Sequence, residues 1–129
     1  MAKEESSMNI EENVASLLCY LAWWVTGILF FAMENKNKTV RFHAIQSILI
    51  FLPISIIGWI LIGPLGVSYS TGSVFGVPIR TPTLSPFYYV GVLIYVLGVI
   101  LWLILMIKAY QGEKFKVPIV GDIAEKQIK

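Results

Sequence analysis

The stretch VASLLCYLAWWVTGILFFAM, residues 14–33, carries no charged side chain and is almost entirely apolar. An α-helix rises about 1.5 Å per residue, so roughly 20 apolar residues cross the ~30 Å hydrocarbon core of a bilayer. Two further stretches, residues 44–79 and 81–107, are equally free of Asp, Glu, Lys, Arg and His. This separation of charge from long apolar runs predicts an integral membrane protein.

Composition supports the same conclusion. The chain has 129 residues, of which 57% are hydrophobic and 14% charged, whereas soluble domains average about 25% charged residues. Its mean hydropathy is +0.74. The length indicates one membrane domain over residues 1–129. A net charge of +2 is too small to indicate a nucleic-acid partner, so the expected partner is the lipid bilayer.

The apolar runs predict an all-α fold with three transmembrane helices, over residues 14–33, 42–65 and 87–107. Residues 66–86 are rich in Gly, Ser, Thr and Pro, which predicts an outer loop with a short hairpin turn at Ser70–Ser73. Residues 108–129 mix basic and apolar side chains. We expect this segment to lie on the membrane surface or to fold back under the helices.

The distribution of basic residues predicts the orientation in the cell membrane. With three crossings, the N-terminus and the outer loop share one side, and the short loop and the C-terminal segment share the other. The first side holds Lys3 and Arg80, and the second holds Lys36, Lys38, Arg41, Lys108, Lys114, Lys116, Lys126 and Lys129. The positive-inside rule therefore predicts a multi-pass protein with its N-terminus outside and its C-terminus in the cytoplasm.

The cytoplasmic start of the second span carries the candidate structural or binding face. His43, Gln46 and Ser47 are spaced i, i+3 and i+4, so they share one side of the helix. Gln46 lies inside the apolar zone, where an unpaired amide costs free energy. We therefore expect it to bond the first helix or the C-terminal segment.

Two charged residues complete this candidate face. Glu34 is separated from Arg41 by a short loop, which permits an ion pair, and Asp122 is a second candidate partner of Arg41. The alternative is that these residues are ordinary polar residues at the membrane–water interface, where the Arg41 side chain reaches lipid phosphate. Pro53, about midway along the same helix, predicts a kink because it cannot donate to the carbonyl of residue 49.

No catalytic, metal or cofactor site is expected. His43 is the only histidine in the chain. It has no second histidine and no acidic or cysteine cluster with metal-ligand spacing, and no paired carboxylates or Ser–His–Asp set accompanies it. The sequence therefore predicts a protein that is not an enzyme.

Two blocks carry a family resemblance, ENVASLLCYLAWWVTGILFF with ENKNKTVRFHAIQSI, and LWLILMIKAYQGEKFKVPIVGDIAEKQ. They resemble the small prokaryotic membrane proteins grouped as uncharacterised, which are distantly related to the twenty-kilodalton, Tic-type subunit of the chloroplast inner-envelope import machinery. The resemblance implies an all-α membrane fold. It also implies a role in a translocation or envelope complex, although the plastid relatives have four membrane helices.

Two functions remain open at this stage. The first is a non-enzymatic membrane protein that acts through association of its helices with a second copy or with other membrane proteins. The alternative is a small oligomeric channel or transporter with His43 and Gln46 at its cytoplasmic mouth. The lack of charge deeper in the predicted spans favours the first function, because transport sites usually carry polar or ionisable groups.

Overall fold

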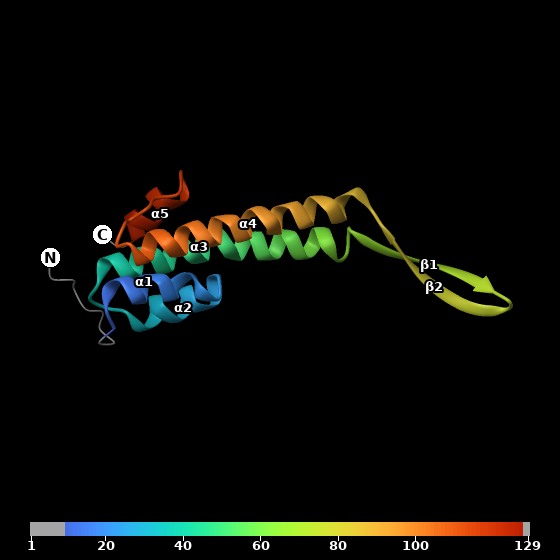
Figure 1. Cartoon of the computed structure of the whole chain (residues 1–129), viewed down its shortest axis with the longest axis horizontal. Helices are drawn as coiled ribbons and strands as arrows, with labels where there is room; N and C mark the ends of the chain where they lie inside the picture. The colour runs from blue at the N-terminus through green and yellow to red at the C-terminus, as the bar shows by residue number, and fades with distance from the viewer. Residues whose placement is uncertain (1–9, 128–129) are drawn as a thin grey trace. The chain divides into compact units, whose positions relative to one another are not determined.

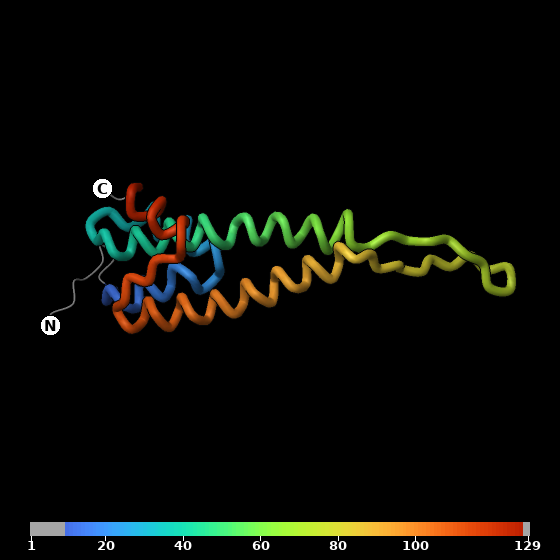
Figure 2. Tube along the Cα trace, turned by 90° about the horizontal axis from the view of Figure 1, so that it is seen from above, coloured from blue at the N-terminus to red at the C-terminus, as the bar shows by residue number. Residues whose placement is uncertain are grey.

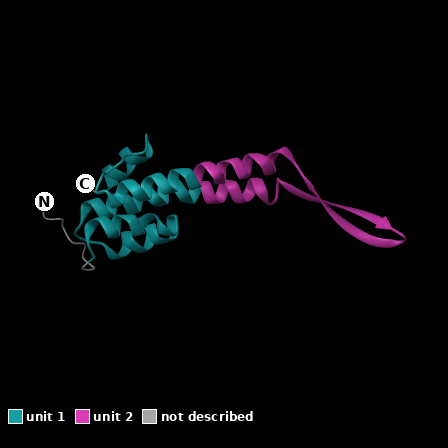
Figure 3. Ribbon diagram, viewed as in Figure 1, with its two compact units in different colours: residues 1–53, 99–129 teal, residues 54–98 magenta. Residues whose placement is uncertain are grey.

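The computed structural model describes residues 10–127 and contains five helices and one pair of strands in this part of the chain (Figure 1). In chain order they are α1 Glu12–Leu21, α2 Trp24–Met33, α3 Lys38–Ile62, β1 Val67–Val74, β2 Val77–Leu84, α4 Pro86–Tyr110 and α5 Val120–Gln127. The chain forms two compact units, residues 1–53 with 99–129 and residues 54–98 (Figure 3).

The first apolar run is a helical hairpin, so the prediction of a single transmembrane helix over residues 14–33 is wrong. The helix ends at Leu21 and a new one begins at Trp24. Between them, where the chain reverses, Trp23 has a φ of 54° and a ψ of −124°, a positive-φ conformation that is uncommon for a residue with a side chain. In Figure 1, α1 and α2 lie side by side.

Both ends of this hairpin meet. The Asn37 side-chain nitrogen donates to the Glu12 carboxylate at 2.8 Å. The residues that enter α1 and those that leave α2 are therefore on the same side of the hairpin. This removes the reason for placing the N-terminus opposite the short loop. The first nine residues themselves lie outside the described part of the chain.

The reversal is supplied with hydrogen-bond partners by three side chains. Thr26 Oγ1 accepts from the Ala22 amide at 3.1 Å and donates to the Cys19 carbonyl at 3.2 Å. Ser47 Oγ on α3 donates to the Trp23 carbonyl at 2.5 Å. Trp102 Nε1 on α4 donates to the Tyr20 carbonyl at 2.6 Å. A chain reversal among apolar helices needs such partners, because an unpaired buried backbone group costs as much as a lost hydrogen bond.

Close packing at a glycine holds α2 against α3. A Cβ at Gly27 would lie 2.9 Å from the Ala44 carbonyl oxygen and 3.1 Å from Ser47 Oγ. Only a residue without a side chain allows the two backbones to approach this closely. On the α1 side, Ala15 and Cys19 pack with Val40 and Ala44 in a buried cluster.

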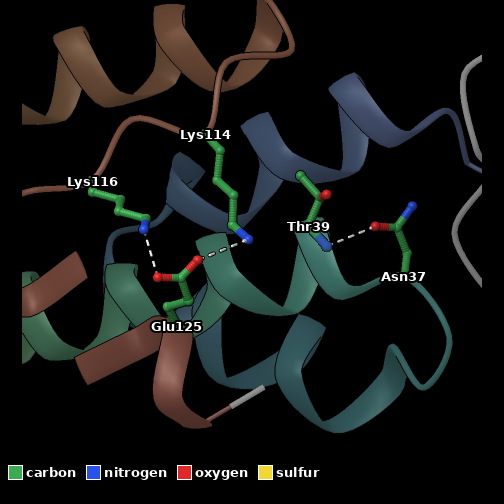
Figure 4. Close-up of polar contacts among 5 residues, drawn as sticks. All are labelled: Asn37, Thr39, Lys114, Lys116 and Glu125. Carbon is green, nitrogen blue, oxygen red and sulfur yellow. Dashed lines mark hydrogen bonds and ion pairs between the residues drawn. The ribbon is translucent and has the colours of Figure 1, made fainter. Parts of the chain in front are cut away.

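The second and third predicted helices are present as α3 and α4, the two helices of the described chain that are long and apolar enough to cross a membrane. Asn37 caps the start of α3, since its Oδ1 accepts from the Thr39 amide at 3.0 Å and from the Val40 amide at 3.2 Å (Figure 4). The helix continues through Pro53, just before the boundary between the two units. The kink itself stays a prediction.

The outer loop forms a β-hairpin, so the all-α prediction is wrong for residues 67–84. β1 and β2 pair antiparallel from Val67↔Leu84 to Val74↔Val77. The turn lies at Phe75 and Gly76, which both have positive φ, as two-residue hairpin turns require. The predicted turn at Ser70–Ser73 is wrong, because these residues lie within β1.

The C-terminal segment folds back onto α3, one of the two arrangements expected for it. Figure 2 follows the chain from the end of α4 into α5. Ala124 of α5 is fully buried in a cluster with Phe42 and Ile45 of α3. At the bend, Gly112 has a φ of 79°. A Cβ added to this residue would lie 3.3 Å from the Asn13 side chain of α1.

The hairpin predicts that Glu11 and Glu113 face the same side of the membrane. Single Glu11→Cys and Glu113→Cys variants, made with Cys19→Ala, can be tested in sealed liposomes or cells with a membrane-impermeant maleimide. We expect both cysteines to react from one side only, and the same side. Reaction of the two from opposite sides would restore the single transmembrane helix over residues 14–33.

Candidate functional site

The polar face predicted at the start of α3 is the centre of a buried hydrogen-bond network. His43 and Gln46 are 2% and 0% exposed, and both contact Tyr20 of α1, which is also fully buried. The Tyr20 hydroxyl lies 2.9 Å from His43 Nδ1. Gln46 Nε2 donates to the same hydroxyl at 3.0 Å. The Tyr20 hydroxyl therefore accepts from Gln46 and shares a second hydrogen bond with His43, whose direction is set by the tautomer of the imidazole.

Gln46 also binds the backbone of the C-terminal segment. Its Nε2 donates to the Phe115 carbonyl at 3.0 Å, and its Oε1 accepts from the Val117 amide at 3.2 Å. One side chain on α3 thus bonds both α1 and the chain between α4 and α5. Both amide protons and the amide oxygen are used, which fixes the orientation of the side chain.

This agrees with the expectation that Gln46 bonds another helix or the C-terminal segment. The contacts fall at Phe115 and Val117, just before the PIVGD sequence of residues 118–122. Gly121 of that sequence packs closely against Lys116 and Gln46. A Cβ at this position would lie 2.6 Å from Lys116 Cβ and 3.1 Å from Gln46 Oε1. Gly121 therefore allows α5 to dock beside Gln46.

Glu34 and Arg41 organise the loop between α2 and α3. Glu34 is fully buried, and its carboxylate accepts from the amides of Lys36 and Asn37, each at 3.0 Å. Arg41 Nη1 donates to the Glu34 backbone carbonyl at 2.9 Å, and its guanidinium lies 4.7 Å from the centre of the Phe31 ring. Arg41 thus contacts Glu34 through the main chain and stacks on α2.

The remaining predicted residues lie apart from this centre. Ser47 holds the α1–α2 reversal through the Trp23 carbonyl. Asp122 is exposed in the first turn of α5, and no bond between Asp122 and Arg41 is found within residues 10–127. Its negative charge acts instead on Lys116.

A cluster of charges covers the outside of the C-terminal segment. Lys116 Nζ lies 2.5 Å from one carboxylate oxygen of Glu125 and Lys114 Nζ lies 3.9 Å from the other (Figure 4). The hydrogen bond to Glu125 raises the pKa of Lys116, to which the negative charges of Glu125 and Asp122 add. Lys114 Nζ also lies 4.9 Å from the centre of the Phe42 ring on α3. These exposed pairs contribute little to stability by themselves.

Two residues central to this network were missed by sequence reasoning. Tyr20 and Trp102 each lie within an apolar run. The residues around them show no pattern that indicates a hydrogen-bond partner. Their roles depend on the chain reversal at Trp23, which brings Tyr20 beside both His43 and Trp102. The signals that could have found the reversal are Thr26 and the Trp23–Trp24 pair in the middle of the first run.

The geometry of this network favours a role in holding α1, α3 and the C-terminal segment together over a role in catalysis or metal binding. Tyr20 and Gln46 bond each other, Gln46 bonds the backbone of the same chain, and His43 bonds Tyr20 through Nδ1. Cys19 is buried, with its sulfur 3.6 Å from the Val40 carbonyl oxygen. Within the described residues, no group of three or more His, Cys, Asp or Glu is placed to hold a metal ion.

Replacing Gln46 by Met is expected to release the C-terminal segment. The Gln46→Met variant keeps the volume but leaves the Phe115 carbonyl and the Val117 amide without their partner. A fully buried group left unpaired costs about 1–3 kcal/mol, and these partly buried groups cost less. We expect a lower unfolding midpoint in detergent and faster tryptic cleavage after Lys114 and Lys116. The control is Gln111→Met, which changes an exposed amide. Equal unfolding midpoints and cleavage rates in the two variants would contradict the role of Gln46 in holding the C-terminal segment.

Comparison with known proteins places this architecture in a family. The model of the magnetosome magnetite crystal formation protein family matches residues 8–124. A UPF0132 membrane protein of Methanocaldococcus jannaschii is 37% identical over 121 residues, covering 94% of this chain and 92% of that protein. A UPF0132 membrane protein of Archaeoglobus fulgidus is 38% identical over 123 residues, covering 92% and 97%.

A second protein of Methanocaldococcus jannaschii with the same family name is 34% identical over 120 residues, covering 93% of this chain and 72% of its own length. No solved structure matches the chain. These matches confirm the predicted small prokaryotic membrane protein family, while the relation to the chloroplast import subunit stays a prediction. The chain belongs to the magnetosome magnetite crystal formation protein family, whose archaeal relatives are UPF0132 membrane proteins.

Proposed function

We propose that this chain is a non-enzymatic, multi-pass protein of the cell membrane that acts through association of its helices with other membrane-embedded chains. The observation that carries this proposal is the inward use of its polar groups. His43, Gln46 and Tyr20 bind parts of their own chain. What the molecule offers to a partner within the bilayer is therefore an apolar helix surface.

The two long helices supply that surface. Most residues in the apolar parts of α3 and α4 are not buried within the chain, and α4 is the less buried of the two helices. Side chains such as Val90, Leu93 and Leu97 of α4 are about half exposed or more. Helices in lipid associate through close packing of such surfaces. These exposed side chains are available to a second copy or to another membrane protein.

The alternative of an oligomeric channel is less well supported. It requires His43 and Gln46 to face a path for ions or solutes. Both are instead buried and bonded to Tyr20, and Gln46 is covered by the chain at Phe115 and Val117. Association is thus favoured over transport.

The proposal includes a new orientation. The α1–α2 hairpin returns to the side from which it enters, so α1 starts on the same side as the loop before α3. Arg80 is the only Lys or Arg in the segment between α3 and α4. The positive-inside rule then puts the start of α1, the short loop and the C-terminal segment in the cytoplasm, with the β-hairpin outside.

The biological setting is the broadest part of the proposal. The family is described by magnetosome magnetite crystal formation, and the sequence resemblance to the Tic-type subunit suggests a translocation or envelope complex. Association within the membrane is common to both settings. We therefore propose association within the membrane as the activity of the present chain. Its partners would be the lipid bilayer, further copies of the chain and other membrane proteins.

Photo-crosslinking within the bilayer tests this function. A photoreactive amino acid at Leu97, which is 57% exposed on α4, is compared with the same group at Leu105, which is 1% exposed. In native membranes and in liposomes of the purified chain, we expect Leu97 to capture a membrane polypeptide or a second copy. The buried control should give links within one chain. Recovery of the Leu97 variant only as a monomer linked to lipid would contradict association.

A further inference from the structure

The two edges of the β-hairpin differ in their capacity to bind another strand. Gly66 accepts a hydrogen bond from the Ser85 amide at 2.9 Å, one step before the pair Val67↔Leu84. Pairing in an antiparallel ladder alternates, so residues of even number in β1 face β2 with their backbone groups. The N–H and C=O groups of Tyr69, Thr71 and Ser73 therefore point away from β2.

The opposite edge is closed by proline. The register pairs Tyr69 with Pro82, Thr71 with Arg80 and Ser73 with Pro78. The outward positions of β2 thus include two prolines, which have no N–H to donate to a further strand. Prolines at these positions are a common means of protecting a sheet edge. In the described chain the sheet has two strands, so β1 has an open edge and β2 a blocked one.

We infer that the open edge of β1 is an interaction surface that pairs with β1 of a second copy of this chain. Pairing of the two β1 edges gives a four-stranded sheet whose outer edges are both the proline-bearing β2. Such a sheet cannot add further strands easily, so the assembly closes as a dimer. A strand of an unrelated protein would complete the edge of one hairpin but would not by itself provide this closure.

The chemistry of β1 suits self-association. Its sequence, VSYSTGSV, contains no charged residue, so two copies bring no like charges together. An antiparallel pairing with Thr71 at the two-fold axis places Tyr69 of each copy opposite Ser73 of the other. In this register all outward N–H and C=O groups of Tyr69, Thr71 and Ser73 find partners. Main-chain hydrogen bonds supply the affinity in such strand addition.

Membrane anchoring and hairpin size add to the argument. An isolated two-stranded hairpin is marginally stable, whereas a sheet of more strands is not. Two copies held in one membrane meet at a high effective concentration. The inference deepens the proposed association function and rests on it, because it locates one contact between copies in residues 69–73.

Matched proline substitutions test the edge directly. Thr71→Pro removes the central outward N–H of β1, and Arg80→Pro removes the outward N–H of its register partner on β2. Neither group bonds within the hairpin ladder. In liposomes, the dimer is measured by energy transfer between copies labelled at Glu113→Cys, made with Cys19→Ala. We expect Thr71→Pro to weaken dimerisation by about tenfold or more, and Arg80→Pro to leave it nearly unchanged.

A second measurement locates the contact. In the Cys19→Ala background, Thr71→Cys should give cross-linked dimers with a short bismaleimide, and Arg80→Cys should not. Equal linking at both positions, no linking at either, or equal loss of dimer in both proline variants would overturn the inference. So would linking of Thr71→Cys only to a different protein in native membranes. If these results occur while Leu97 still captures a second copy, association stands and the strand-edge contact fails.

Discussion

The structure depends on one constraint, the need of backbone groups at the α1–α2 reversal to find partners among apolar helices. The chain turns at Trp23, whose carbonyl is bound by Ser47, while Trp102 binds the carbonyl of Tyr20. These donors come from α3 and α4, so the reversal and the packing of the two long helices stabilise each other. Loss of either side-chain donor would remove one of the hydrogen bonds that each of these carbonyl oxygens accepts.

The same reversal creates the polar network. Because the chain returns at Trp23, Tyr20 lies close to the His43 and Gln46 side chains near the start of α3. In a single helix over residues 14–33, Tyr20 would lie roughly three and a half turns away from the loop before α3. Gln46 then connects α1, α3 and the segment before α5 through one amide group. A buried amide with all its protons paired specifies a unique arrangement more strictly than apolar packing alone. This explains why polar residues stand within an apolar helix although they show no catalytic geometry.

Much of the fold could be predicted from the sequence, and the rest could not for physical reasons. Charge-free length located α3 and α4, and the cost of an unpaired amide predicted that Gln46 has partners in the protein. Hydropathy could not separate one long helix from two short ones over residues 14–33, because both consist of the same apolar side chains. The separation depends on the positive φ of Trp23 and on hydrogen-bond donors distant in the sequence. The sequence predicts a short hairpin turn at Ser70–Ser73, but the turn lies at Phe75 and Gly76. Gly, Ser, Thr and Pro favour turns throughout this segment, so composition does not fix the register of the strands.

The hairpin of α1 and α2 is the central claim, and a distance between its ends tests it most directly. Spin labels at Glu11→Cys and Lys36→Cys, with Cys19→Ala, can be measured by pulsed electron resonance in nanodiscs. The account predicts a separation set by two packed helices, about 8–10 Å between axes, plus the length of the labels. A separation of about 30 Å or more, the length of a single helix across the bilayer core, would contradict it.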